Sequence, residues 1–109
     1  MPTEYRVLGQ LLATANTLGT LYTVPSSKQA VVSTISVCNL AATNATFGIC
    51  VRQAGAAQTA SQYIAMGATA PANDTIVLTL GITLTATDVV SVSASTSTVS
   101  FGCFGSQIN

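Results

Sequence analysis

The sequence predicts an all-β fold, a single-domain antiparallel β-sandwich or jelly roll of about eight strands over residues 1–109. Three observations predict it: apolar and polar residues alternate along short runs, turn-forming residues separate these runs, and β-branched residues are abundant. The chain has 17 Thr and 11 Ser, and threonine, valine and isoleucine suit a pleated, half-buried surface. A length of 109 residues is typical of one domain, so we expect one hydrophobic core.

Eight runs with a period of two are the expected strands. The clearest is residues 75–85, where apolar side chains at every second position would share one face: Ile76, Leu78, Leu80, Ile82 and Leu84. The other seven runs are residues 5–12, 19–24, 30–39, 45–53, 61–66, 88–95 and 99–106. Turn-forming residues fill the intervals 13–18, 25–28, 41–44, 54–60, 67–73, 86–87 and 95–98. Segment 54–60 is expected to be a surface loop, and its composition also allows a short helix.

Three hairpins are predicted by matching the apolar faces of consecutive strands. Their expected cross-strand pairs are Val37 with Phe47, Leu84 with Asp88, and Ala94 with Val99. The first register places Cys38 and Cys50 about 13 Å apart at the usual rise per residue, which is too far for a disulfide. With Cys103, the cysteines are odd in number and lack a CxxC spacing, so we expect free thiols and a reducing compartment.

The near absence of charge excludes several classes of function. Only 6% of the residues are charged, whereas about 25% is usual. Three isolated basic residues cannot neutralise a phosphate backbone, so we expect no nucleic-acid binding. Histidine is absent, which removes the commonest general base and metal ligand near neutral pH. We expect no membrane span and no signal peptide, because neither a long apolar run nor a leader pattern is visible.

The few candidate catalytic groups have structural interpretations that we favour. Ser26, Ser27 and Lys28 supply the residue types of a Ser-Lys pair, but they lie in a predicted turn, where an exposed lysine is normally solvated. Asp74 and Asp88 should lie at opposite ends of one strand, and each should accept backbone N–H bonds after a turn. The sequence therefore predicts that the protein is not an enzyme and has no catalytic, cofactor-binding or metal-binding residue.

Aromatic residues and glycines near the C-terminus suggest a contact surface. Three of the six aromatic side chains align with apolar neighbours, so we expect core packing as the default, but Phe104 should lie on the face opposite Phe101. We therefore expect Phe104 to touch a partner. Gly102 and Gly105 lie within a strand pattern and do not precede a helix, so they do not match a phosphate-binding loop. We expect them to permit a bulge or the close approach of another backbone.

Two adjacent segments carry a family resemblance: LYTVPSSKQAVV at residues 21–32 and ISVCN at residues 35–39. They resemble a run that opens the β-sandwich of a group of small virion proteins of tailed phages, including cyanophages. Looser similarity extends through residues 51–57, 72–81, 87–92 and 104–106. Leu40 and Gly48 stand where the family pattern has charged residues, which favours a more apolar contact surface here.

The resemblance implies a structural protein of the virion, above all a capsid decoration (cement) protein on the capsid surface. Such a protein would be made in the host cytoplasm without a signal peptide, form a homotrimer and bind between major capsid proteins to stabilise the head. Its expected partners are the major capsid protein and copies of itself, with no cofactor. The candidate assembly contacts are Tyr5, Val7, Leu8, Leu40 and Phe104. The first strand, at residues 5–12, is expected to pair with a neighbour by strand addition.

The alternative is a tail or baseplate adhesin module that binds host surface glycans. Carbohydrate sites combine an aromatic face with nearby amide or carboxylate groups, and Tyr63 and Asn73 are the candidates for those roles. The two hypotheses differ in copy number, because a decoration protein is abundant in the virion and an adhesin is scarce.

Overall fold

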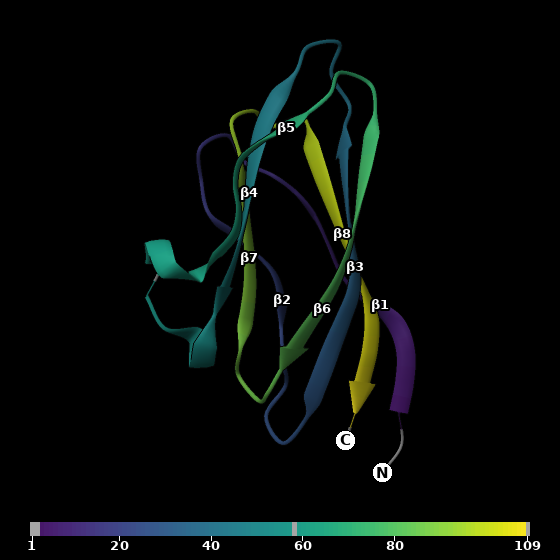
Figure 1. Cartoon of the computed structure of the whole chain (residues 1–109), viewed down its shortest axis with the longest axis vertical. Coiled ribbons are helices and arrows are strands. Elements are labelled where there is room, and N and C mark those ends of the chain that lie inside the picture. The colour runs from purple at the N-terminus through teal and green to yellow at the C-terminus, as the bar shows by residue number, and fades with distance from the viewer. Residues whose placement is uncertain (1–2, 58, 109) are drawn as a thin grey trace.

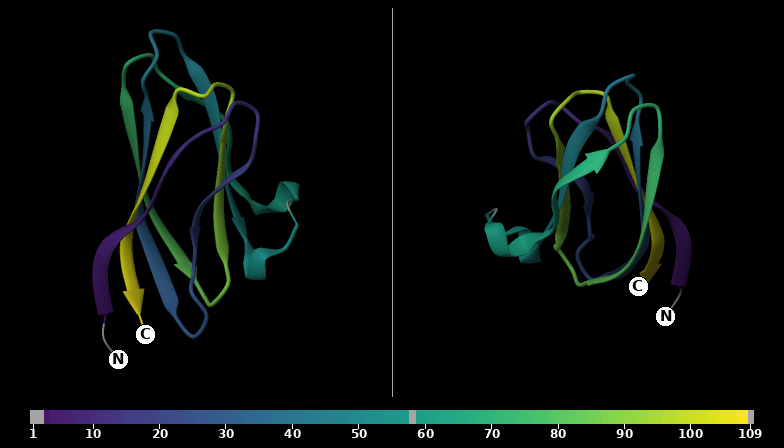
Figure 2. Two further views of the ribbon diagram at one scale, coloured as in Figure 1. Left: turned by 180° about the vertical axis from the view of Figure 1, so that it is seen from behind. Right: turned by 45° about the horizontal axis from the view of Figure 1, so that its top comes forward.

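The computed structural model describes residues 3–57 and 59–108, in which eight strands form two four-stranded antiparallel sheets (Figure 1). Sheet A has the strand order β1-β8-β3-β6, and sheet B has the order β2-β7-β4-β5. The strands are β1 (Thr3–Leu12), β2 (Gly19–Thr23), β3 (Gln29–Asn39), β4 (Ala45–Arg52), β5 (Tyr63–Ala70), β6 (Thr75–Leu84), β7 (Val89–Ala94) and β8 (Val99–Ile108). The sheets pack face to face, which confirms the predicted all-β sandwich (Figure 2).

Each sheet is built from strands that are far apart in the sequence. Among the described strands, β4 and β5 are the only consecutive pair in one sheet, and every other connection crosses between the sheets. The order 1-8-3-6 facing 2-7-4-5 is the topology of a jelly roll. β1 begins where β8 ends, with Thr3 opposite Ile108, so both chain ends lie at one end of the sandwich, the terminal end (Figure 1).

All eight predicted strands are present, but the three predicted hairpins are wrong. β3 lies in sheet A and β4 in sheet B, and the pairs β6–β7 and β7–β8 are divided in the same way. The loops between these strands have four or five residues, enough to cross the roughly 10 Å between packed sheets at about 3.3 Å per residue. The inward faces were nevertheless identified correctly, because Val37 and Phe47 are both buried and enter the core from opposite sheets.

Strand β5 extends further than the predicted run of residues 61–66. Gly67, which the sequence places in a turn, lies inside this strand with a φ of +67°. It forms a bulge in which Met66 and Gly67 oppose Gly48 of β4. In the predicted loop at 54–60, residues 56, 57 and 59 are irregular, and residue 58 lies outside the described residues. Its ends form two single-turn 3₁₀ helices, η1 (Gln53–Gly55) and η2 (Ala60–Gln62).

The core consists of the alternate residues that point between the sheets. Phe47 of β4 and Phe101 of β8 meet edge to face across the sandwich, with ring centroids 6.3 Å apart. Fully buried aliphatic side chains surround this contact from both sheets, including Val32, Ile35, Val37, Ile49, Val90 and Val92. Burial of one such side chain stabilises the fold by about 1.5–3 kcal/mol, so this set is the main attraction between the sheets.

Asn39, at the end of β3, is a buried polar residue that fastens the end of the sandwich far from the termini. Its side-chain amide donates to the carbonyl oxygens of Thr43, at 2.8 Å, and Ala70, at 3.0 Å. Its side-chain oxygen accepts from the N–H of Ala41 at 3.0 Å and from the hydroxyl of Thr98 at 3.4 Å. One side chain therefore ties the β3–β4 loop to the end of β5 and to the β7–β8 loop.

Replacing Asn39 with alanine should destabilise the fold by about 2 to 4 kcal/mol, because it leaves one buried and two partly buried backbone groups without their hydrogen bonds. The measurement is the free energy of unfolding from urea denaturation. Asn44→Ala is the matched control, because Asn44 accepts one exposed bond, from the N–H of Ala72, and its loss should cost less than about 1 kcal/mol. Equal losses for the two variants would contradict the role assigned to Asn39.

Candidate interaction face

The residues of the possible Ser-Lys pair lie in the β2–β3 turn at the terminal end. Ser26 and Ser27 are exposed, and the N–H of Lys28 closes the turn on the carbonyl of Pro25 at 3.3 Å. Among the described residues, the Lys28 amine has no hydrogen-bond or ion-pair partner, so no group holds it against a serine hydroxyl. The turn offers no activated nucleophile.

Asp74 and Asp88 lie at opposite ends of β6, as the sequence predicts, and both accept hydrogen bonds from the backbone. Asp74 is exposed and accepts from the N–H of Thr75 at 2.8 Å. Asp88 is buried and accepts from the N–H of Ala54 at 2.8 Å, and from the N–H and hydroxyl of Thr85. It therefore joins the loop after β4 to the β6–β7 turn.

The charge of Asp88 is stabilised by these bonds. Burial by itself would raise the pKa of the Asp88 carboxyl, but the hydrogen bonds from Ala54 and Thr85 outweigh burial and hold this pKa below its ordinary value of 3.8. A group with this environment is an anchor for two loops and stays ionised at neutral pH, where a general acid would need a proton to donate.

The three cysteines are free thiols, as predicted, and two of them are buried. Burial raises the pKa of the Cys103 thiol to about 12. Burial also raises the pKa of Cys50, partly opposed by the positive charge of Arg52. Thiols with raised pKa values are poor nucleophiles and poor metal ligands at neutral pH.

The residues that the structure describes also contain no group of three or more His, Cys, Asp or Glu side chains placed to hold a metal ion. None of the helices in this part of the chain is long and apolar enough to cross a membrane.

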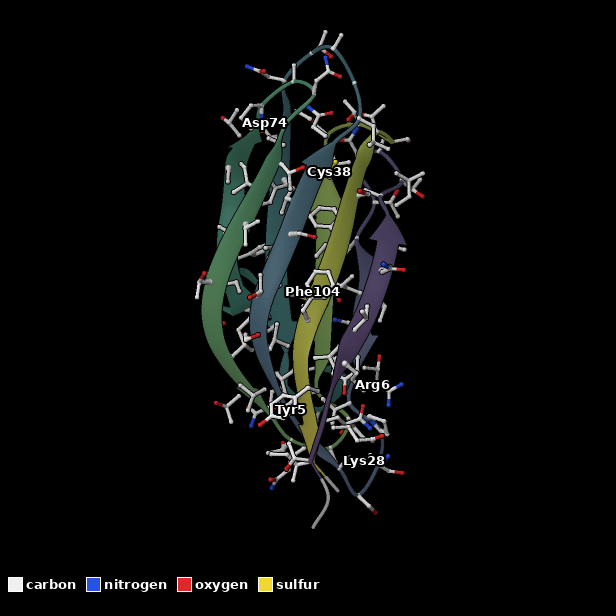
Figure 3. All side chains as sticks on the ribbon, turned by 90° about the vertical axis from the view of Figure 1, so that its right-hand side faces the viewer. Tyr5, Arg6, Lys28, Cys38, Asp74 and Phe104 are labelled. Atoms are coloured by element: carbon white, nitrogen blue, oxygen red, sulfur yellow. The ribbon has the colours of Figure 1, made fainter. Side chains whose placement is uncertain are left out.

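Sheet A, seen from outside in Figure 3, carries four of the seven large apolar side chains that are exposed in the described part of the chain: Tyr5, Val7, Leu12 and Val77. Tyr5 is 87% exposed, Val7 is 50% exposed and Val77 is 60% exposed. Phe104 lies in the middle of this face between its strand neighbours, opposite Val7 of β1 and Thr34 of β3. Large contiguous clusters of exposed apolar side chains are uncommon on monomeric proteins, so this surface is the candidate interaction face.

Phe104 forms a ridge between two shallow hollows on this face. Its ring covers Gly102, since a Cβ atom on Gly102 would lie 2.9 Å from the ring. The hydroxyl of Ser33 donates to the Phe104 carbonyl at 3.2 Å and fixes the backbone there. A hollow of about 350 Å³ lies towards Tyr5, and another of about 340 Å³ lies towards Leu12. The two recesses could accept side chains from a partner.

Charge is confined to the margins of this face. Strands β3, β6 and β8 contain no charged residue at all. In Figure 3, Arg6 and Lys28 lie at the terminal end of the face and Asp74 lies at the far end. Glu4 and Arg6 form a single exposed ion pair with a 3.9 Å separation, which adds little to stability.

Three of the five predicted assembly contacts, Tyr5, Val7 and Phe104, meet on this face through the pairing of β1 with β8. Leu8 does not join them, because successive side chains of a strand point to opposite faces: Val7 points outward, so Leu8 points inward and packs against the core. Leu40 is exposed in the β3–β4 loop, away from the sheet surface. Sequence reasoning missed Leu12 and Val77, although both are apolar residues on the outward positions of their strands.

The two predicted glycan contacts are not brought together. Tyr63 begins β5 on sheet B, whereas Asn73 follows the other end of that strand and has a left-handed backbone with a φ of 52°. The backbone N–H of Asn73 binds the carbonyl of Ala41 at 2.9 Å, which places Asn73 in a structural turn. Tyr63 and Asn73 therefore cannot form one sugar site as proposed from the sequence.

Replacing Asp88 with asparagine should lower stability by about 1 to 3 kcal/mol at pH 7, because an amide cannot accept all the bonds that the carboxylate accepts. Since the folded pKa is lowered, this contribution is present above pH 3.8 and is lost as the pH falls through the folded value. Urea denaturation between pH 2 and pH 7 gives the free energy of unfolding of the original protein and of the Asp88→Asn protein. The difference between these two free energies should become smaller in acid. A difference that does not change with pH would contradict the role assigned to the Asp88 carboxylate.

No protein-family model matches the chain, and no curated protein matches its sequence. Its functional assignment therefore depends on the surface described above and on the resemblance of segments 21–32 and 35–39.

Proposed function

We propose that the protein is a structural protein of a phage virion, a capsid decoration protein that binds between major capsid proteins and stabilises the head. The observation that supports this most is the outer face of sheet A, which exposes Tyr5, Val7 and Val77 and carries no charge on three of its four strands. Jelly rolls are common in viral capsid proteins, although a fold by itself does not decide function.

The physical properties of this face suit docking on a protein shell. Apolar area is removed from water when two such surfaces meet, and no charged group on β3, β6 or β8 has to be desolvated. The Phe104 ridge and the hollows beside it make the face uneven, so that a partner of complementary shape can bind it specifically. Aromatic residues in well-packed positions often carry most of the binding energy of an interface.

Self-association belongs to the same proposal. A net charge of zero gives the molecules little electrostatic repulsion, so copies can approach closely. β1 forms one edge of sheet A, and its outer backbone groups are available for strand addition by a neighbouring copy. We propose a homotrimer seated where capsid subunits meet.

The proposal predicts that Val7→Asp weakens binding to heads assembled without the protein by about 10- to 100-fold, because the interface would bury an unpaired charge. Binding is measured by co-sedimentation over a concentration series. The matched control is Ile64→Asp, since Ile64 on sheet B is 48% exposed and Val7 is 50% exposed. Ile64→Asp should bind as the original protein does.

Two results would overturn this function. One is equal binding by the Val7→Asp and Ile64→Asp proteins. The other is a low copy number in the purified virion, because a decoration protein occupies a repeated site on the shell. A density map of the particle would in addition reveal whether sheet A faces the shell and whether the copies form trimers.

A further inference from the structure

A second concave surface lies on the outer face of sheet B, on the opposite side of the sandwich from the proposed docking face. It is a hollow of about 310 Å³ lined by residues from β4, β5, β7 and the β1–β2 loop. This volume is at the lower end of the range for small-molecule sites, roughly 300–1,000 Å³. The residues that matter for its chemistry are Asn16, Thr46, Gly48, Tyr63, Met66 and Ser93.

Gly48 lies at the floor of the hollow, where the surrounding atoms leave no free space for a side chain. A Cβ atom at this position would lie 3.2 Å from the carbonyl oxygen of Ala65 and 3.3 Å from both the Ser93 hydroxyl and the Tyr63 ring. The Tyr63 ring therefore packs closely over the backbone of β4. Opposite Gly48, the bulge at Met66 and Gly67 widens β5 and places Met66, 72% exposed, on the rim.

The lining selects a ligand without charge. None of its residues is charged, and Arg52, the one charged residue in the strands of sheet B, donates to the Ser91 hydroxyl and the Ala56 carbonyl instead. An anion or a cation would therefore lose its hydration without gaining an ion pair. A neutral ligand does not meet this cost.

The polar and apolar groups of the hollow match a sugar ring. Thr46 and Ser93 contribute hydroxyls and Asn16 contributes a side-chain amide, so the site can both donate and accept hydrogen bonds. Tyr63 and Met66 contribute apolar surface. A pyranose has this same division, with C–H groups on one face and hydroxyls around its edge.

We propose that this hollow binds one ring of a neutral saccharide, with Tyr63 against the C–H face and Thr46, Ser93 and Asn16 near the hydroxyls. The site is independent of the docking function, because it lies on sheet B and the docking face lies on sheet A. Both can be occupied at once, so a shell-bound molecule would present the hollow outwards.

The test uses the full chain labelled with ¹³C at its methionine methyl groups and observed by NMR. The sequence contains two methionines, so Met66 gives a resolved reporter on the rim of the hollow. The probes are glucose, galactose, mannose and N-acetylglucosamine, with sialic acid as the charged comparison. We expect at least one neutral sugar to shift the Met66 signal with a Kd of about 1 mM, and sialic acid to bind at least tenfold more weakly.

Variants then locate the site. Tyr63→Ala should weaken the binding at least tenfold, Ser93→Ala should weaken it about threefold to tenfold, and Tyr63→Phe should preserve most of it because the ring remains. Tyr5→Ala is the matched control, since Tyr5 lies on sheet A, and it should leave the Kd unchanged. If the Tyr63→Ala protein does not fold, the Kd values of the Ser93→Ala and Tyr63→Phe proteins still test whether the sugar binds in this hollow.

Three outcomes would overturn the saccharide site. The first is no shift of Met66 with any neutral sugar at 50-fold the expected Kd. The second is an unchanged Kd in the Tyr63→Ala or Ser93→Ala protein. The third is equal or tighter binding of sialic acid. None of these outcomes changes the result expected for capsid binding by the Val7→Asp protein. The saccharide site can therefore be wrong while the docking function is right, and the reverse.

Discussion

The packing of alternate side chains between the two sheets is the constraint on which the rest of the structure depends. Neither sheet could bury its apolar face alone, and the contact between Phe47 and Phe101 joins residues more than 50 positions apart. Because successive side chains of a strand point to opposite faces, filling this core also decides which residues point outwards. The surfaces that we assign to docking and to saccharide binding are what remains after the core is filled.

Buried polar groups hold this packing in register. Asn39 at the far end and Asp88 at the terminal end each bind backbone groups from more than one loop, so the short connections between the sheets have satisfied hydrogen bonds. Inside the sandwich, the Tyr22 hydroxyl of β2 donates to the Gln107 side chain of β8 at 3.2 Å. Burial raises the pKa of Tyr22, which keeps this hydroxyl protonated as a donor.

The two outer faces have different shapes for local reasons. On sheet A, Gly102 makes room for the Phe104 ring, and the face remains broad and apolar. On sheet B, Gln62 of η2 lies against β4, where its side chain accepts a hydrogen bond from the Cys50 thiol at 3.4 Å. Beyond that contact, the sheet surface is hollowed beside Gly48, where a side chain would crowd Ser93 and the Tyr63 ring. The low charge of the chain leaves the apolar face of one sheet and the neutral hollow of the other without nearby ionic groups.

The sequence by itself determined the eight strands and the inward or outward direction of most side chains, because period-two alternation is a local property of the chain. It also identified Asp74 and Asp88 as backbone anchors and Phe104 as an outward aromatic. It could not determine strand pairing, since the inward residues of all strands are similar and a loop of four or five residues can either turn within a sheet or cross to the other. Only the tertiary structure placed Val7 beside Phe104, separated Tyr63 from Asn73 and assembled the hollow around Gly48. Each of these depends on contacts between distant segments, and no local pattern encodes such contacts.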